Sequence, residues 1–313
     1  GRSHFMTISA GIALYPSQAS NFGELLRKAD AALHRAKQTG KTRCVLFDDS
    51  IQNDLIRRTE LENGLRNAIE NGEISVAYQP QIDLASGKAI GFEALARWNS
   101  RRYGAVSPGE FIPIAEESGQ IAKIGFFVLR AAARFIKEAQ AAGIEGFIVS
   151  VNVSVKQLRD DGFARDIVEI MRKEGVLHGR VTLEITESFM IENLAPIAEK
   201  LASLKAAGFS LSLDDFGKGY SSLSYLKGLP IDYIKIDKAF IDDITETENG
   251  RVLVNAIVSL SHRLGFTVVA EGVEDAAQVA LLRDYGCDMI QGYYYAKPMA
   301  DDLALAQLEK TFP

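Results

Sequence analysis

Eight short apolar segments that alternate with helical stretches limit the possible folds of this chain more than any other feature. Strands rich in Val, Ile and Leu that alternate with amphipathic helices are typical of β-α units and of a mostly parallel sheet. Eight of them within roughly 240 residues predict a closed barrel of the TIM type. In chain order the segments read ISVAYQPQIDL, AIGFEALARW, FIVSVNVS, VTLEITES, FSLSLDD, YIKID, TVVAEG and MIQGYYYA.

The first two segments differ from the rest in their connection. Only the turn ASGK, residues 85–88, separates them, which predicts a β-hairpin and therefore an antiparallel pair. One strand of the barrel should accordingly run against its neighbours. The predicted fold class is α/β: a TIM-like (β/α)8 barrel with one antiparallel strand, preceded by a small N-terminal α/β stub.

The N-terminal part of the chain is too short to form a domain of its own. Residues 1–6, GRSHFM, are interpreted as an expression scar. Residues 7–50 contain a strand, a helix and a short strand, and three such elements cannot easily enclose a core. Residues 51–313 begin with a polar, helix-prone connector and continue into the barrel.

Composition excludes several classes of function. A formal charge of −6 gives no general attraction to a DNA or RNA polymer. No apolar run approaches the roughly 20 residues of a membrane span. The four histidines form no HExxH motif, and Cys44 and Cys287 form no CxxC pair, which argues against zinc. Two reduced thiols fit a reducing compartment, so we expect a cytoplasmic location, with membrane tethering left to regions outside this chain.

Nearly every predicted strand carries a polar side chain near its C-terminal end. Each one alone has an ordinary explanation as a helix cap, a turn residue or a surface group. In a parallel barrel, however, all strand C-termini open on one face. The set comprises five carboxylates, two amides and one ammonium: Glu93, Asn152, Glu184, Asp214, Asp215, Lys235, Glu271 and Gln291.

Five converging carboxylates would repel one another strongly unless cations neutralise them. Hard oxygen ligands without thiolate or imidazole suit Mg²⁺ or Mn²⁺. The adjacent carboxylates of Asp214 and Asp215 could hold two cations a few ångströms apart. Two such ions can activate a water and clamp a phosphoryl centre, which predicts two-metal phosphodiester hydrolysis.

At this point the sequence resembles a known family, the EAL-domain cyclic di-GMP phosphodiesterases, over roughly residues 55–310. That resemblance implies a (β/α)8 barrel with one antiparallel strand that opens cyclic di-GMP to linear pGpG. Six motifs carry it in the expected order: FEALARW, NVSVKQL, LEITES, LDDFGKGYSSLSYLKGLPIDYIKID, VAEGVED and IQGYYYAKPM.

The resemblance assigns the metal ligands residue by residue. Glu93, Asn152, Glu184 and Asp214 would hold one ion. Asp214 would bridge to a second ion, and Asp215 would complete much of that second site.

The resemblance also assigns the other roles. Lys235 would hydrogen-bond the attacking water or the phosphate. Glu271 would support the second metal or act as general base, and Gln291 would orient the water network. Gln79 and Arg97 would position the substrate, since a guanidinium fits a phosphodiester oxygen well.

A loop after the Asp-Asp doublet is expected to respond to dimerisation or ligand binding. Glu187 would tie this loop, residues 216–222, to the metal site, and Gly217 and Gly219 would give it freedom to rearrange. Lys218 stands where the family commonly has threonine. A homodimer is expected from the family alone.

The N-terminal stub resembles the last part of a GGDEF, or diguanylate cyclase, domain. TISAGIALYP followed by ADAALHRAKQTGK carries this likeness, with His34 in place of the usual tyrosine. The GGDEF signature itself is absent, so no cyclase activity is expected. We interpret the chain as a truncation whose intact form has a complete GGDEF domain and sensory modules upstream.

Two other functions stay open from the sequence. One is a non-catalytic cyclic di-GMP receptor, although such modules usually lose metal ligands and this chain retains them. The other is a barrel that abstracts a proton alpha to a carboxylate, with Mg²⁺ on acids and Lys235 as the base. The Asp-Asp doublet and Arg97 favour a phosphodiester over this second alternative.

Overall fold

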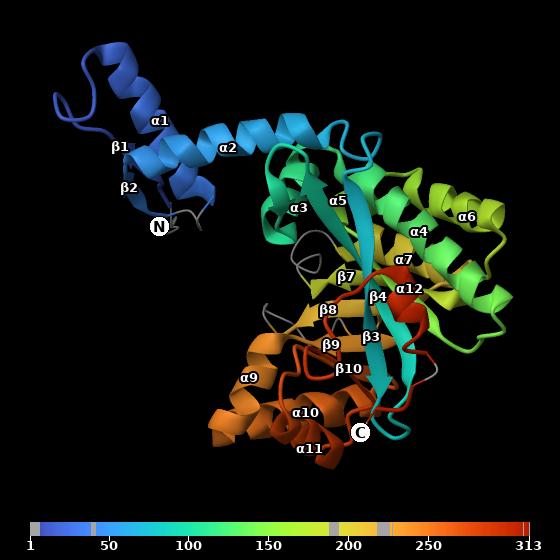
Figure 1. Cartoon of the computed structure of the whole chain (residues 1–313). Helices are drawn as coiled ribbons and strands as arrows, with labels where there is room; N and C mark the ends of the chain where they lie inside the picture. Colours follow the sequence, from blue (N-terminus) through green and yellow to red (C-terminus); the bar gives the residue numbers. More distant parts are fainter. Residues whose placement is uncertain are drawn as a thin grey trace. The chain divides into compact units, whose positions relative to one another are not determined.

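A computed structural model describes residues 7–38, 42–187, 194–217, 226, 228–308 and 310–312. The chain divides into two compact units, Gly1–Asn67 and Ala68–Pro313. Figure 1 shows the elements of both. The predicted domain boundary between residues 50 and 51 stays a prediction. In the described part of the chain, no helix has the length and apolar character needed to cross a bilayer.

The first unit has the strand, helix and strand that the sequence predicts, followed by a second helix. Strands β1 (Ala10–Ile12) and β2 (Cys44–Leu46) pair in parallel. Helix α1 (Phe22–Gln38) connects them, and α2 (Asp49–Leu65) follows. The Asp48 side chain caps α2 by accepting from the backbone N–H groups of Ser50 and Ile51. A small core forms here from Ala32, Phe47 and Ile51.

The second unit contains the predicted barrel. Eight strands close on themselves because β3 pairs with β11 at one end of the sheet order and with β4 at the other. A ninth strand, β5 (Gly104–Val106), pairs only with β4 outside the barrel and was not predicted. The barrel strands are β3 (Ile74–Asp83), β4 (Ala89–Ser100), β6 (Ile148–Asn152), β7 (Val181–Thr186), β8 (Ser210–Phe216), β9 (Tyr233–Ile236), β10 (Thr267–Glu271) and β11 (Met289–Gln291).

The antiparallel strand is β3, as the hairpin predicts. It runs against both β4 and β11, whereas the other barrel pairs are parallel. In Figure 1, β3 and β4 form the long pair of blue-green arrows. The segment MIQGYYYA is strand only over its first three residues, Met289–Gln291.

Helices follow most of the parallel strands, as expected for β-α units. The predicted helical stretches 194–208 and 250–265 correspond to α7 and α10. The helices of this unit are α3 (Pro108–Ser118), α4 (Ile121–Ala141), α5 (Val155–Arg159), α6 (Phe163–Glu174), α7 (Leu194–Ala206), α9 (Lys238–Glu246), α10 (Glu248–Arg263), α11 (Ala276–Asp284) and α12 (Asp301–Leu305), with a 3₁₀ turn at His178–Arg180.

Packing against α4 decides which face of β3 and β4 looks into the barrel. The ring of Phe135, on α4, stacks on Tyr78 at 4.2 Å between centroids and meets Phe92 edge-on at 5.4 Å. Successive side chains of a strand point to opposite faces. The next residue along each strand, Gln79 and Glu93, is therefore directed into the barrel.

Candidate active site

The register of the barrel places the predicted polar residues beside one another. Asn152 on β6 lies opposite Glu184 on β7, and Glu271 on β10 lies opposite Gln291 on β11. Glu93 pairs with Gln79 across the β3–β4 hairpin. Because parallel strands end at the same rim, side chains far apart in sequence converge there.

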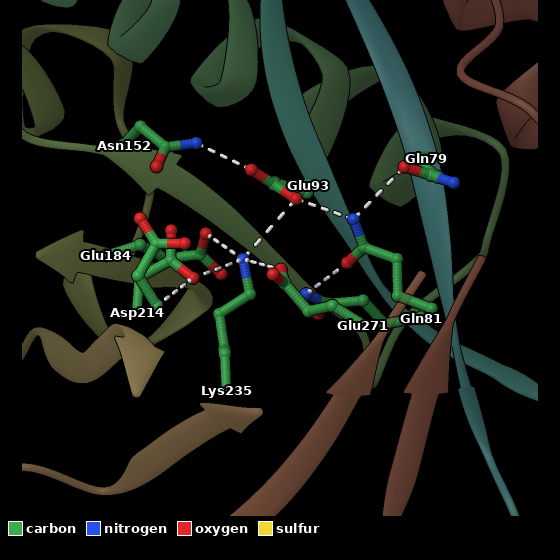
Figure 2. A network of polar contacts seen from close by, with 10 residues as sticks. Gln79, Gln81, Glu93, Asn152, Glu184, Asp214, Lys235 and Glu271 are labelled. Carbon is green, nitrogen blue, oxygen red and sulfur yellow. Dashed lines mark hydrogen bonds and ion pairs between the residues drawn. The ribbon is translucent and has the colours of Figure 1, made fainter. Parts of the chain in front are cut away.

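Lys235, on β9, is at the centre of the site (Figure 2). Its side chain is 1% exposed, and four carboxylates from four different strands surround its ammonium. The Nζ atom lies 2.6 Å from Glu184 Oε2, 2.6 Å from Glu271 Oε1, 3.4 Å from Glu93 Oε2 and 3.6 Å from Asp214 Oδ1. The structure thus brings together the side chains that the sequence placed on separate strand ends.

One ammonium cannot neutralise four buried carboxylates, and the pKa values reflect this excess. Burial raises the pKa of Glu184 well above its usual value, against the Lys235 charge. Burial likewise raises the pKa of Asp214, and raises that of Glu271 to about 8. Lys235 shows the complementary effect: burial lowers its pKa, but the surrounding carboxylates outweigh burial and raise it, so its ammonium stays charged.

Glu93 differs from the other three carboxylates because amide groups hold it. Asn152 Nδ2 donates to Glu93 Oε1 at 2.6 Å, and Gln291 Nε2 donates to Oε2 at 2.5 Å. Burial raises the pKa of Glu93, but Lys235 and these hydrogen bonds together outweigh burial and lower it. Glu93 is therefore held as an anion, which is the form that binds a cation.

The donor set fits a hard divalent cation, although the side chains are not arranged around one. Among the described residues, no group of three or more His, Cys, Asp or Glu side chains is arranged to hold a metal as it stands. The reason is visible in Figure 2: the carboxylates point toward the Lys235 ammonium. Their charge excess and their oxygen donors are what Mg²⁺ or Mn²⁺ requires.

The Asp-Asp doublet lies near the end of β8 and has an unusual backbone conformation. Asp215 has φ 57°, which is rare for a non-glycine residue, and its N–H donates to Asp214 Oδ1 at 2.8 Å. Gly217 follows with φ 102°, and a Cβ there would lie 2.6 Å from the Phe240 ring. The backbone therefore requires glycine at position 217. The positive φ of Asp215 also interrupts the regular alternation of side chains along β8.

Glu187 contacts the first residue after β8, and its predicted role in holding the loop stays a prediction. It is buried, and its Oε2 accepts from the backbone N–H of Gly217 at 2.8 Å. Lys218 and Gly219 lie outside the described residues, as does most of the predicted loop 216–222. This hydrogen bond joins the residue directly after β7 to the residue directly after β8.

A cavity of about 510 Å³ borders Asn152, and none of the four carboxylates around Lys235 lines it. Leu95 and Arg97 of β4 line it together with Asn152, so it opens beside the site. Arg97 is about half-buried, donates to the Ala96 carbonyl at 2.9 Å, and has a pKa lowered by burial. The volume of the cavity is within the roughly 300–1,000 Å³ typical of small-molecule pockets.

The sequence interpretation missed one buried member of this network, Gln81. Its Nε2 donates to Gln291 Oε1 at 3.1 Å, and Gln291 also donates to Gln79 Oε1 at 3.1 Å. Gln79 donates in turn to the Ala296 carbonyl at 3.2 Å. The available signal was strand alternation: Gln79 and Gln81 are two residues apart and so share the inward face.

Comparison with known proteins agrees with this geometry. The EAL domain model matches residues 62–298, which is most of the chain. The chain belongs to the EAL-domain family. The diguanylate cyclase, GGDEF domain model matches residues 1–43, which confirms the predicted GGDEF remnant.

Curated relatives with EAL domains are considerably longer than this chain. The cyclic di-GMP phosphodiesterase NbdA of Pseudomonas aeruginosa is 36% identical over 310 residues, which are 99% of this chain and 39% of NbdA. The bifunctional diguanylate cyclase/cyclic di-GMP phosphodiesterase MucR of the same organism is 36% identical over 97% of this chain and 45% of MucR. The chain thus spans less than half the length of either relative.

Solved EAL structures share the barrel. The PaMucR phosphodiesterase in complex with c-di-GMP matches with a TM-score of 0.76 and 36% identity, over 78% of this chain and 99% of that one. The EAL domain of Mycobacterium smegmatis DcpA matches with a TM-score of 0.65 and 32% identity, over 77% of this chain and 98% of that one.

Proposed function

We propose that this EAL-domain chain is a metal-dependent phosphodiesterase that hydrolyses cyclic di-GMP to linear 5′-pGpG. One observation carries the proposal: four carboxylates from four strands converge on the buried Lys235. The phosphodiesterase names of NbdA and PaMucR, and the c-di-GMP bound to PaMucR, support this substrate.

The proposed ligands of two Mg²⁺ or Mn²⁺ ions are Glu93, Asn152, Glu184, Asp214 and Asp215. A pair of such ions, when bound, would activate a water and stabilise charge on the phosphodiester. Support comes from the oxygen donor set and from the excess of carboxylates over ammonium groups around Lys235.

The remaining side chains have roles that follow from their chemistry. Lys235 donates a hydrogen bond to the attacking water or to the phosphate, because its ammonium stays charged. Glu271 supports the second ion or accepts a proton from water as general base. Gln291 orients the polar network, and Glu187 holds the backbone after the doublet through Gly217.

Substrate positioning is assigned to Arg97 and Gln79. Arg97 lines the cavity, where its guanidinium can bind a phosphodiester oxygen.

In the proposed reaction the water oxygen would form the new bond to phosphorus. The bond between phosphorus and the 3′ oxygen would break, and the 3′ oxygen would leave with a proton. The product is a linear dinucleotide with a 5′ phosphate.

The test of this function is direct. The protein is incubated with cyclic di-GMP and Mg²⁺ or Mn²⁺, and pGpG is followed by chromatography, with EDTA and cyclic di-AMP reactions as controls. We expect pGpG only with metal. Tight binding of cyclic di-GMP without product would reject hydrolysis in favour of the receptor alternative, which no described position of the site favours.

Assembly is a separate prediction. We expect a homodimer and, in the intact protein, GGDEF and sensor regions upstream of this chain. The GGDEF match at residues 1–43 supports the GGDEF part of the second expectation. Sedimentation of the purified chain would test the first.

A further inference from the structure

Gln81 is a buried polar residue to which the proposed mechanism gives no role. It lies on β3, is 2% exposed, and faces the barrel interior two residues after Gln79. A buried amide without hydrogen bonds destabilises the folded protein, so the partners of Gln81 are informative. The described partner is Gln291, which follows 210 residues later in the chain.

The hydrogen bonds around Gln291 define the direction of its amide. Its Nε2 donates to Glu93 Oε2 at 2.5 Å and to Gln79 Oε1 at 3.1 Å. Its Oε1 accepts from Gln81 Nε2 at 3.1 Å. An amide NH₂ has two donors, and here both are used on the side that faces Glu93.

Rotation of this amide by half a turn would reverse every contact. The Gln291 oxygen would then face Glu93 Oε2 and Gln79 Oε1, and three acceptors would meet without a proton between them. The Gln291 NH₂ would face the Gln81 NH₂, two donors without an acceptor. Glu93 can only accept, so it requires this direction of Gln291, and Gln81 supports the same direction as the donor to Gln291 Oε1.

The neighbouring backbone leaves room for this arrangement. A Cβ at Gly91, on β4, would lie 2.8 Å from Gln81 Oε1 and 3.0 Å from Ile148 Cγ1. Any larger residue at position 91 would displace the Gln81 amide or the β6 side chain beside it. Glycine at this position is what allows the Gln81 side chain to reach Gln291.

We propose that Gln81 is a positioning residue that stabilises the amide direction of Gln291 required by Glu93 and, through it, holds Glu93 in place for cation binding. Its kinetic consequence rests on the proposed hydrolysis. Its structural consequence, the orientation of Gln291, does not, so the two can fail separately.

The first test uses metal affinity and a double-mutant cycle. Gln81→Met removes the donor with little change in volume, and we expect Mn²⁺ affinity and kcat to fall about tenfold, as for other residues that orient metal ligands. In a Gln291→Met background the same substitution should have almost no further effect, because its target is gone. Equal losses in both backgrounds, or no loss in either, would overturn the proposal.

The matched control is Gln278→Met, on α11. Gln278 is also buried and donates to the Ile241 carbonyl at 3.2 Å, outside the site. It should lose thermal stability by a similar amount while Mn²⁺ affinity and kcat stay within twofold. If Gln278→Met lost as much Mn²⁺ affinity and kcat as Gln81→Met, the effect would be one of general packing and the proposal would be rejected.

The second test needs neither metal nor substrate. Protein labelled with ¹⁵N-glutamine gives a side-chain NH₂ signal for Gln291, which is assigned through its loss in Gln291→Met. We expect this signal to shift or broaden in Gln81→Met, and also in Gly91→Ala, which displaces Gln81 by another route. An unchanged Gln291 signal in folded protein would refute the positioning role, even if hydrolysis is established. A changed signal without any hydrolysis would support the positioning role and reject the phosphodiesterase.

Discussion

The barrel mouth has two contiguous halves that surround their carboxylates with different side chains. The amide half comprises β11, β3, β4 and β6, where Glu93 accepts from the amides of Asn152 and Gln291, and Gln291 is hydrogen-bonded to Gln79 and Gln81. The acidic half comprises β7, β8, β9 and β10, where Glu184, Asp214 and Glu271 lie around one ammonium, that of Lys235, and Asp215 follows Asp214 on β8.

The difference teaches that the groups around each carboxylate, rather than burial alone, decide its charge. Burial raises the pKa of Glu93, Glu184 and Glu271 alike, but at Glu93 the Lys235 charge and two amide donors together outweigh burial and lower the pKa. The amide half thus presents a fixed anion. The acidic half has excess negative charge that a cation can satisfy.

The largest expected effect is the loss of that fixed anion. Glu93→Ala should abolish turnover of cyclic di-GMP, at about 3 kcal/mol or more of transition-state stabilisation, or roughly two orders of magnitude in rate. The measurement is kcat/KM with saturating Mn²⁺, and Glu93→Gln separates charge from shape. A near-normal rate would show that the site lies elsewhere.

Metal binding should reduce the repulsion among the carboxylates of the acidic half and thereby stabilise the protein. At a Mn²⁺ concentration 100 times Kd we expect a gain of about 2.7 kcal/mol in unfolding free energy over protein in EDTA. Calorimetry of wild type, Glu184→Gln and the exposed control Glu169→Gln would show the gain in the first and third proteins only. A full gain in Glu184→Gln would exclude Glu184 as a ligand.

Converting an amide of the first half into a carboxylate should make the two halves alike. Asn152→Asp removes the 2.6 Å donor to Glu93 and adds a like charge beside it. We expect kcat/KM to fall by an amount that corresponds to about 2 kcal/mol of lost transition-state stabilisation, the scale of a hydrogen bond to a charged group. Asn99→Asp, at an exposed position of β4, controls for the added charge. Wild-type activity in Asn152→Asp would mean that the amide donor is dispensable.

The smallest effect is expected where the acidic half meets the loop after β8. Glu187→Ala removes the acceptor of the Gly217 N–H and should lower kcat about tenfold, or about 1.4 kcal/mol, while some binding of cyclic di-GMP remains. Glu187→Gln keeps an acceptor oxygen and should retain most activity. Unchanged kinetics in Glu187→Ala would show that other contacts hold this backbone.

Much of the fold was predictable because its signals are local. Apolar segments bounded by turns predicted all eight barrel strands, and the ASGK turn predicted the antiparallel β3. The strand β5 was missed, since Gly104–Val106 is only three residues long and gives no alternation to detect. The YYYA part of the last segment is not strand. It was predicted as strand because aromatic residues have a high strand propensity, but propensity alone does not provide a partner strand.

By itself, the sequence determined the order of the strands and which polar residues end them, because strand alternation and turns depend on neighbouring residues. Only the tertiary structure decided the partners at the mouth. Gln81 meets Gln291 across 210 residues, and Lys235 meets Glu184 across 51. Hydrogen bonds and pKa shifts depend on distances of a few ångströms between side chains, and those distances are set only when the barrel closes.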